Sequence, residues 1–250
     1  MTLAFPIALL KSSAAAWAPT NLSTDLLGWW DTQDAASITH SSGAVSQWND
    51  KSGNGKHLTQ ATSGNKPTYS ATGMDGSLPA ISATDTARNL SNTSFTIGAS
   101  SLSVVLVAYV DATASNNARL CSWFNGTNDY QGTTNGVIPF LAKTPSSMGG
   151  YWNLSDRGSA SASFGVKRWF ISEWDGSTGN HKIYVGGSAG SAVAWSSSNT
   201  FSGAGTLRLM NSSLGSEGCI GRFGEAFVVK RVLTAGERTS IAAYMARWGL

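Results

Sequence analysis

The sequence feature that most constrains the fold is the apolar run Leu102–Val110, LSVVLVAYV. Nearly all of its residues are apolar and many are β-branched, which is typical of a strand buried on both faces. Such a strand needs an apolar layer on each side. The run therefore predicts the central strand of a β-sandwich.

Further strands are predicted at 26–31, 44–48, 78–83, 93–97, 119–124, 137–141, 150–154, 167–174, 182–186, 205–210 and 221–232. Stretches rich in Gly, Asn, Asp and Ser separate them, and these residues favour turns. The composition agrees, because only 12% of the residues are charged while 28 are Gly and 10 are Trp. We therefore expect one all-β, antiparallel domain and not alternating β and α units.

One helix is predicted at 234–249. Thr234 and Glu237 have the spacing of a capping box, in which the two side chains satisfy backbone N–H groups reciprocally. Gly249 can end the helix. Four apolar residues repeat at helical spacing between these points: Ile241, Tyr244, Met245 and Trp248. This stripe predicts a helix that covers one sheet or one sheet edge.

The segment 50–61, DKSGNGKHLTQA, begins like the calcium loop of an EF-hand. That loop needs a bidentate carboxylate at its twelfth position and a helix on each side. The twelfth residue is Ala61, and both flanks alternate apolar and polar residues as strands do. The segment is therefore predicted to be a turn in which Asp50 bonds to the backbone and the Gly and Asn residues adopt positive φ.

Charge and cysteine content exclude several kinds of site. The chain has 17 basic and 14 acidic residues, and its cations never form a run longer than a pair, which disfavours nucleic acid binding. No apolar run is long enough to span a bilayer. Cys121 and Cys219 lie far apart without a CxxC pattern, so we expect no zinc site and either one disulfide or two buried thiols.

Residues 1–18 are predicted to form an arm. Its apolar residues, mostly spaced by two, are Leu3, Phe5, Ile7, Leu9 and Leu10. Pro6 limits an extended arm to edge pairing or an irregular path. A signal peptide is the alternative, although no basic residue precedes the apolar core. We expect the arm to dock on its own domain or on another subunit.

Four segments carry a resemblance to a known family: LLGWWDTQDAASIT (26–39), VSQWNDKSGNGKHLTQ (45–60) with KPTY after it, ISEWDGSTGNHKIYVGG (171–187) and IGRFGEAFVVKRVLTAGERTSIAAYMARWG (220–249). They resemble the laminin G-like, concanavalin A-like jelly roll domains of bacterial surface proteins and bacteriophage virion proteins. The resemblance implies a two-sheet jelly roll over 19–250, with the helix included and Trp48 packed inside. Some members hold calcium, but no loop here offers several closely spaced carboxylates. The resemblance therefore leaves calcium as an alternative whose ligands we cannot assign, and we expect no other cofactor.

Laminarinase-type glucanases share this fold, so catalytic patterns need a test. Glu173 and Asp175 have the alternate spacing that places two carboxylates on one strand face, but the third acid is missing. The string GGSAG at 186–190 fits G-x-S-x-G, yet no helical period follows it, which favours a glycine-rich turn. The three histidines, His40, His57 and His181, each lie near a predicted turn and are expected to be exposed or capping. We expect no enzymatic activity.

Aromatic residues beside amides and acids are the remaining candidates for ligand contact. Sugar sites combine flat aromatic faces with polar side chains, usually on loops. Two segments, 121–132 and 149–158, have this composition and supply the candidate ligand residues Trp123, Asn125, Asp129, Tyr130, Trp152 and Arg157. The tryptophans of strand-like runs are expected in the core: Trp29, Trp30, Trp48, Trp169 and Trp174.

The resemblance, the apolar arm and the weak catalytic patterns together predict a non-enzymatic structural protein of a phage particle. It would be a head decoration or tail-associated protein, located in the virion and able to bind glycans. Its expected partners are further copies of itself, other virion proteins and a host surface polysaccharide. The alternative is a secreted or surface carbohydrate-binding module, which would be extracellular.

Overall fold

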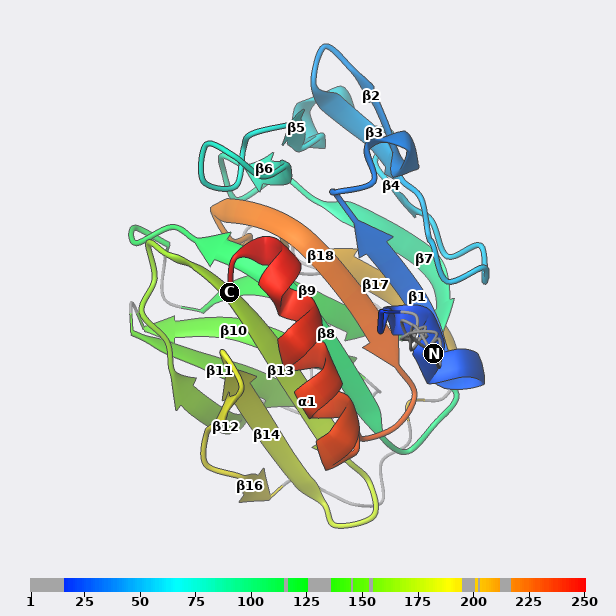
Figure 1. The fold of residues 1–250 in the computed structure, drawn as a ribbon, viewed down its shortest axis with the longest axis vertical. Coiled ribbons are helices and arrows are strands. Elements are labelled where there is room, and N and C mark those ends of the chain that lie inside the picture. Colours follow the sequence, from blue (N-terminus) through cyan, green and yellow to red (C-terminus); the bar gives the residue numbers. More distant parts are fainter. Residues whose placement is uncertain are drawn as a thin grey trace, which may run out of the picture.

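The computed structural model describes residues 16–114, 117–125, 136–144, 146–152, 155–194, 201, 203–211 and 217–250, with backbone alone at 143, 144, 152 and 155–158. This part of the chain is mainly β-strand, with one α-helix near the C-terminus (Figure 1). The predicted class, antiparallel β with one C-terminal helix, is therefore confirmed. The apolar arm residues Leu3, Phe5, Ile7, Leu9 and Leu10 lie outside the described residues.

The strands are β1 (Leu26–Asp31), β2 (Ile38–Ser41), β3 (Ala44–Trp48), β4 (Leu58–Thr59), β5 (Thr68–Ser70), β6 (Ala80–Ala83), β7 (Leu90–Thr96), β8 (Leu102–Val110), β9 (Ala118–Phe124), β10 (Gly136–Thr144), β11 (Ser147–Trp152), β12 (Ser155–Ser161), β13 (Lys167–Asp175), β14 (Asn180–Val185), β15 (Ser188–Ala189), β16 (Val193–Ala194), β17 (Ala204–Leu209) and β18 (Gly221–Val229). The helical segments are η1 (Pro19–Asp25), η2 (Ala35–Ser37), η3 (Ser63–Asn65), α1 (Ala235–Tyr244) and η4 (Met245–Trp248).

The strands form one continuous antiparallel network with two long runs. The first run has the order β1–β18–β8–β13–β14, and the short strands β15 and β16 both pair with β14. The second run has the order β4–β7–β17–β9–β10–β11–β12. Strand β18 also pairs with β6, and β6 leads through β5 and β3 back to β4. The network therefore turns back on itself and brings the two runs together.

Strand β8 is buried on both faces, as its apolar run predicted. Val104 and Leu106 belong to one apolar cluster, which also contains side chains of β9, β10 and β17 from the second run. Val105 and Val107 point the other way, into a cluster shared with α1 and η4. The first cluster lies between the two runs, and the second lies between the first run and the C-terminal helix.

Helix α1 crosses the outer face of the first run (Figure 1). The predicted capping box is confirmed: Thr234 Oγ1 accepts from Glu237 N at 3.2 Å, and Glu237 Oε2 accepts from Thr234 N at 2.8 Å. Gly249 ends η4 in the left-handed region, at φ 66°. A Cβ on Gly224 of β18 would lie 2.6 Å from Trp248 Cη2, so the glycine makes room for this indole.

The segment 50–56 covers the free edge of β1. Trp29 N donates to Asp50 Oδ1 at 2.9 Å, and Trp29 O accepts from Lys51 N at 2.7 Å. Asn54 Nδ2 donates to Leu26 O at 2.8 Å. The turn prediction is confirmed, although positive φ occurs at the two glycines and not at Asn54, which contributes its side chain instead. The loop supplies hydrogen bonds that an edge strand would otherwise leave open.

Other predictions are settled by burial. The five tryptophans that were expected in the core are all buried. Cys121 and Cys219 are both buried free thiols, so the disulfide alternative is excluded, and burial raises the pKa of each thiol.

Of the predicted arm, residues 16–18 are described, and the Trp17 ring packs against Tyr244 at 5.3 Å between centroids. Within the described ranges no helix is long and apolar enough to cross a membrane.

Candidate functional site

The structure places the predicted ligand residues in different environments. Trp123 is fully buried, and its Nε1 donates to Phe95 O at 2.8 Å, so this indole is part of the core and its faces are closed to a sugar. Asn125 is half-buried at the end of β9. Asp129 and Tyr130 lie outside the described residues.

Strand register brings the two predicted ligand loops to the same end of the second run. Val137 of β10 pairs with Trp123 on one side and with Trp152 on the other. The C-terminal ends of β9 and β11 therefore lie at the same end of the second run, with β10 between them. Arg157 lies on β12, where its backbone pairs with Gly150, and side chains are not described at Trp152 and Arg157. Ligand contact by these residues stays a prediction.

A groove of about 460 Å³ lies where β11 and β12 meet the β14–β15 hairpin. Its lining residues are Ser147, Ser159, Ala160, Ser161, Val185, Ser188, Ala189, Gly190 and Ser191. None of them is charged, and five are serines. The groove thus offers hydroxyl and backbone hydrogen-bonding groups above small apolar side chains.

Glycines shape this groove. The string at 186–190 forms the tight β14–β15 turn, with φ 56° at Gly186 and 85° at Gly187, so the predicted glycine-rich turn is confirmed. Gly190 sits so close to β12 that a Cβ there would overlap Ser159 O. An isolated antiparallel bridge joins Ser159 to Ser191. The hairpin is therefore fastened to β12 beside the groove.

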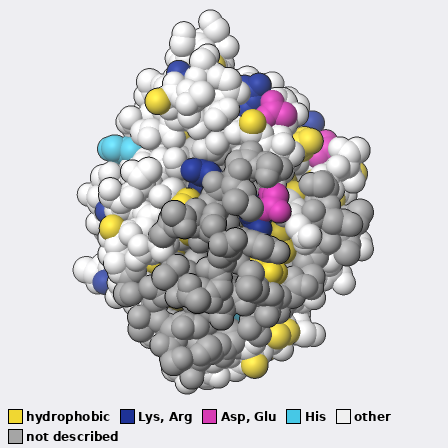
Figure 2. Space-filling view, turned by 180° about the vertical axis from the view of Figure 1, so that it is seen from behind, with side chains coloured by type: hydrophobic (Ala, Val, Ile, Leu, Met, Phe, Trp, Pro, Cys, Tyr) yellow, Lys and Arg dark blue, Asp and Glu magenta, His cyan; other side chains and the backbone are white. Residues whose placement is uncertain are grey.

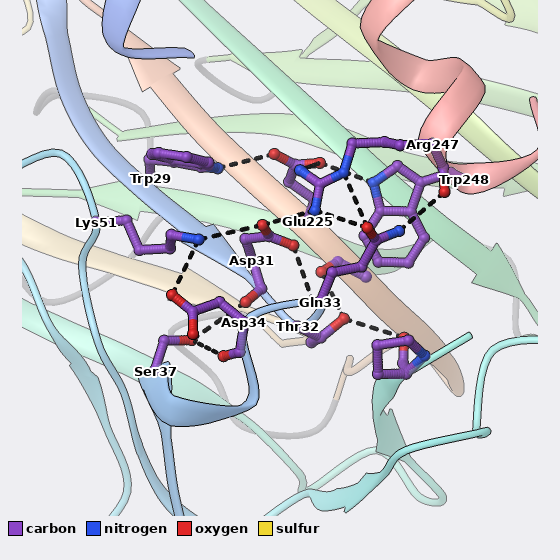
Figure 3. A network of polar contacts seen from close by, with 12 residues as sticks. Trp29, Asp31, Thr32, Gln33, Asp34, Ser37, Lys51, Glu225, Arg247 and Trp248 are labelled. Atoms are coloured by element: carbon purple, nitrogen blue, oxygen red, sulfur yellow. Dashed lines mark hydrogen bonds and ion pairs between the residues drawn. The ribbon is translucent and has the colours of Figure 1, made fainter. Parts of the chain in front are cut away.

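A buried polar network joins β1, β18 and the C-terminal helix (Figure 3). Asp31 and Glu225 lie opposite each other in the β1–β18 register and are 2% and 1% exposed. Arg247 Nη2 donates to Asp31 Oδ2 at 2.8 Å, and Lys51 Nζ lies 3.3 Å from the same oxygen. Two carboxylates and two cations thus share one closed space.

Glu225 accepts from three neutral donors. Trp29 Nε1 and Tyr244 OH each donate to Oε1 at 2.8 Å, and Trp248 Nε1 donates to Oε2 at 2.7 Å. Burial raises the pKa of Glu225 to about 7; the Asp31 charge adds to this shift, and Arg247 opposes it. Because both carboxylates are covered and bonded, the network fastens η4 to the sheet and does not face a ligand.

His181 contradicts the expectation of an exposed or capping histidine. It is fully buried and stacks on Trp174, its β13 partner, with 3.8 Å between ring centroids. Its Nε2 lies 2.9 Å from Ser172 Oγ, and that oxygen accepts from Trp174 Nε1 at 3.0 Å. The contact pairs a serine with a histidine as nucleophilic sites do, but all three side chains are enclosed in the core. His40 and His57 do accept turn N–H groups, from Gly43 and Asp50.

The Glu173 and Asp175 carboxylates bond to different parts of the chain. Glu173 is buried and accepts from Arg238 Nη1 at 2.9 Å, so it holds α1. Asp175 caps the turn after β13 by accepting from Ser177 N at 2.9 Å and Thr178 Oγ1 at 2.8 Å. Across the described residues, no three His, Cys, Asp or Glu side chains gather as a metal ion would require.

No family model matches this sequence, and no curated protein sequence matches it. Similar solved structures include Trypanosoma rangeli sialidase in complex with sialic acid, with a TM-score of 0.60 and 9% sequence identity over 87% of this chain and 32% of the sialidase. An arabinofuranosidase complexed with arabinofuranosyl-alpha-1,2-xylobiose has a TM-score of 0.56 and 15% identity over 80% of this chain and 50% of that enzyme. The chain thus spans about a third of the sialidase and half of the arabinofuranosidase, and at these identities the similarity concerns the fold.

Two expectations need correction. A phage structural protein and a chain without enzymatic activity were both predicted, but the structures that share the fold include those of a sialidase and of an arabinofuranosidase, which are carbohydrate-active enzymes. The resemblance to virion proteins was carried by segments that specify the fold, and a fold is shared among proteins of different function. The broader expectation, a β-sandwich of the lectin and glucanase kind, agrees with the comparisons.

Proposed function

We propose that this chain is a carbohydrate-binding domain of a secreted or surface carbohydrate-active protein, built as a two-sheet jelly roll. The observation that carries the proposal is the fold that the chain shares with parts of a sialidase and of an arabinofuranosidase. The apolar cluster between the two runs of strands supports the jelly roll arrangement. A carbohydrate-binding module was also the alternative that we considered from the sequence.

The principal sugar contacts are proposed for the loops that leave the end of β9–β12. Asn125, Asp129 and Tyr130 belong to the first loop, and Trp152 and Arg157 flank the second. Aromatic faces pack on sugar C–H groups, while amides, acids and guanidinium groups bond to hydroxyls. Trp123 and Trp152, which flank these loops, both pair with Val137, and this shared pairing supports the proposal.

Binding and hydrolysis can be measured together on the purified chain. Calorimetric titrations with a panel of neutral and sialylated oligosaccharides are expected to find at least one ligand, and reducing-end release tests hydrolysis of the bound sugar. Arg157→Ala should weaken binding, whereas Arg168→Ala, a half-exposed arginine on β13, should not. Absence of binding up to about 10 mM sugar, beyond the roughly 1 mM Kd of a weak site, would overturn the proposal.

A further inference from the structure

We infer that the serine-lined groove between β12 and the β14–β15 hairpin is a second sugar site and that its ligand is a neutral, uncharged saccharide. The inference rests on the proposed carbohydrate-binding function and assigns it a further location. At about 460 Å³ the groove falls within the roughly 300 to 1,000 Å³ of small-molecule sites. It can therefore hold a short saccharide.

The groove lies away from the proposed ligand loops. Ser147 pairs with Ser161 beside the β10–β11 connection, whereas Trp152 pairs with Ser155 at the other end of the same two strands. The β11–β12 ribbon thus ends in the second ligand segment on one side and forms a wall of the groove at the other end. A sugar in the groove would leave the loops free.

The chemistry of the lining selects an uncharged ligand. A serine hydroxyl both donates and accepts, as a sugar hydroxyl does, and it rotates to suit its partner. Carboxylate and phosphate groups are bound by Arg, Lys or several N–H donors, and none of the described lining residues is cationic. An acidic sugar would therefore lose solvation without gaining a charged partner.

The groove also has an apolar floor and a fixed shape. Ala160 and Val185 are each 8% exposed and offer a small apolar surface to the C–H groups of a sugar ring. Gly190 N donates to Ile183 O at 2.7 Å, and the Ser159–Ser191 bridge holds the hairpin against β12. A preformed groove lowers the ordering cost of binding. Because the described lining residues include no aromatic side chain, we expect a Kd on the order of 1 mM.

The test uses amide chemical shifts of the full chain during titration with lactose, maltose, cellobiose or xylobiose, and with 3′-sialyllactose as the acidic counterpart of lactose. At least one neutral disaccharide is expected to shift the amides of 159–161 and 188–191. Ser188→Trp should fill the groove and weaken this binding by about tenfold or more. Ser41→Trp is the matched control, since Ser41 is also an exposed strand serine but lies on β2, far from β12 and β14 (Figure 1).

A thermal melt shows whether Ser188→Trp is folded. Ser161→Trp places the same bulky side chain on β12, at the other side of the groove, and should weaken binding in the same way. If sugars shift the loop amides alone, the groove inference is wrong while the proposed function stands. Stronger binding of 3′-sialyllactose than of lactose at the groove amides would overturn the neutral class. If no sugar shifts any amide, the inference and the proposed function both fail.

Discussion

Asp50 shows how one side chain can replace part of a neighbouring strand. Its Oδ1 accepts from Trp29 N at 2.9 Å, a strand N–H on the edge of β1, and its Oδ2 accepts from Lys56 N at 2.8 Å. The carboxylate therefore fixes the loop and closes the sheet edge at once. Buried or half-buried N–H groups of this kind are costly when they lack an acceptor.

Asp50→Ala should lower the free energy of unfolding by about 1 to 3 kcal/mol, because it leaves the N–H groups of Trp29 and Lys56 without their acceptors. Urea denaturation measures the change. Asp34→Ala is the control: its carboxylate is 40% exposed and pairs with Lys51, so its loss should cost about 0 to 1 kcal/mol. Equal losses in the two variants would show that Asp50 acts as an ordinary surface charge.

At the scale of an element, α1 depends on a well-formed N-terminus and on its apolar contacts with the first run. The Thr234–Glu237 capping box begins the helix, and Arg231 pairs with Glu237 at 2.7 Å. Ile241 and Met245 are fully buried against strands of the first run. The helix thus covers an apolar sheet face that would otherwise be open.

Thr234→Ala should destabilise the chain by about 0.5 to 2 kcal/mol, because Glu237 N loses the hydroxyl that caps it. Thr239→Ala is a matched change on the exposed face of α1. There the Thr239 hydroxyl bonds back to Ala235 O, and alanine has the higher helix propensity, so stability should be unchanged or should rise by a few tenths of a kcal/mol. Unfolding curves in urea distinguish the two signs, and a loss in both variants would contradict this account.

Elements with a strong local pattern were predictable, and those formed by pairing alone were not. The apolar run of β8 and the capping box of α1 specify their structures locally. Strand β12, with the sequence SDRGSAS, has no apolar alternation and exists because β11 pairs with it. The groove was missed for the same reason, since its serines meet through β12 and a two-residue strand.

Contacts that depend on strand register could not be predicted from the sequence either. Asp31 and Glu225 lie far apart in the sequence and become neighbours through the β1–β18 register. His181 is enclosed because β14 places it opposite Trp174. The two ligand segments could be proposed from composition, but the position of Trp123 and Trp152 at one sheet end follows from the pairing of both with Val137.

At the scale of the whole molecule, the described carboxyl groups divide into two sets, whose pKa shifts change the free energy of unfolding in opposite directions as the pH rises. Buried Glu225 has a pKa raised to about 7, and burial also raises the pKa of Glu173. By contrast, the bond from Arg231 is the main cause that lowers the pKa of Glu237 to about 2, and a bond from Thr113 likewise lowers the pKa of Asp111. The first set opposes folding near neutral pH, and the second supports it.

Stability should therefore pass through a maximum near pH 4.5 to 5. Above an unfolded pKa of about 4.5, the native state keeps a proton on Glu225 that the unfolded chain has lost, so the free energy of unfolding falls, by roughly 1 to 3 kcal/mol, as the pH rises to about 7. Below pH 4.5 the unfolded chain takes up protons before Glu237 does, so stability also falls toward pH 2.

Urea titrations across this range, repeated on two variants, separate the two limbs of the pH profile. Glu225→Gln cannot ionise, so it should flatten the limb between pH 4.5 and 7. Its absolute stability will also change, because the amide faces the Trp248 N–H, but the flattening does not depend on that change. Glu237→Gln should instead reduce the acid limb and leave the neutral limb unchanged, since its carboxylate bonds to Arg231 and lies outside the Glu225 network. A wild-type stability that rises steadily from pH 4.5 to 7 would mean that Glu225 is ionised in the fold, with Arg247 outweighing burial and Asp31.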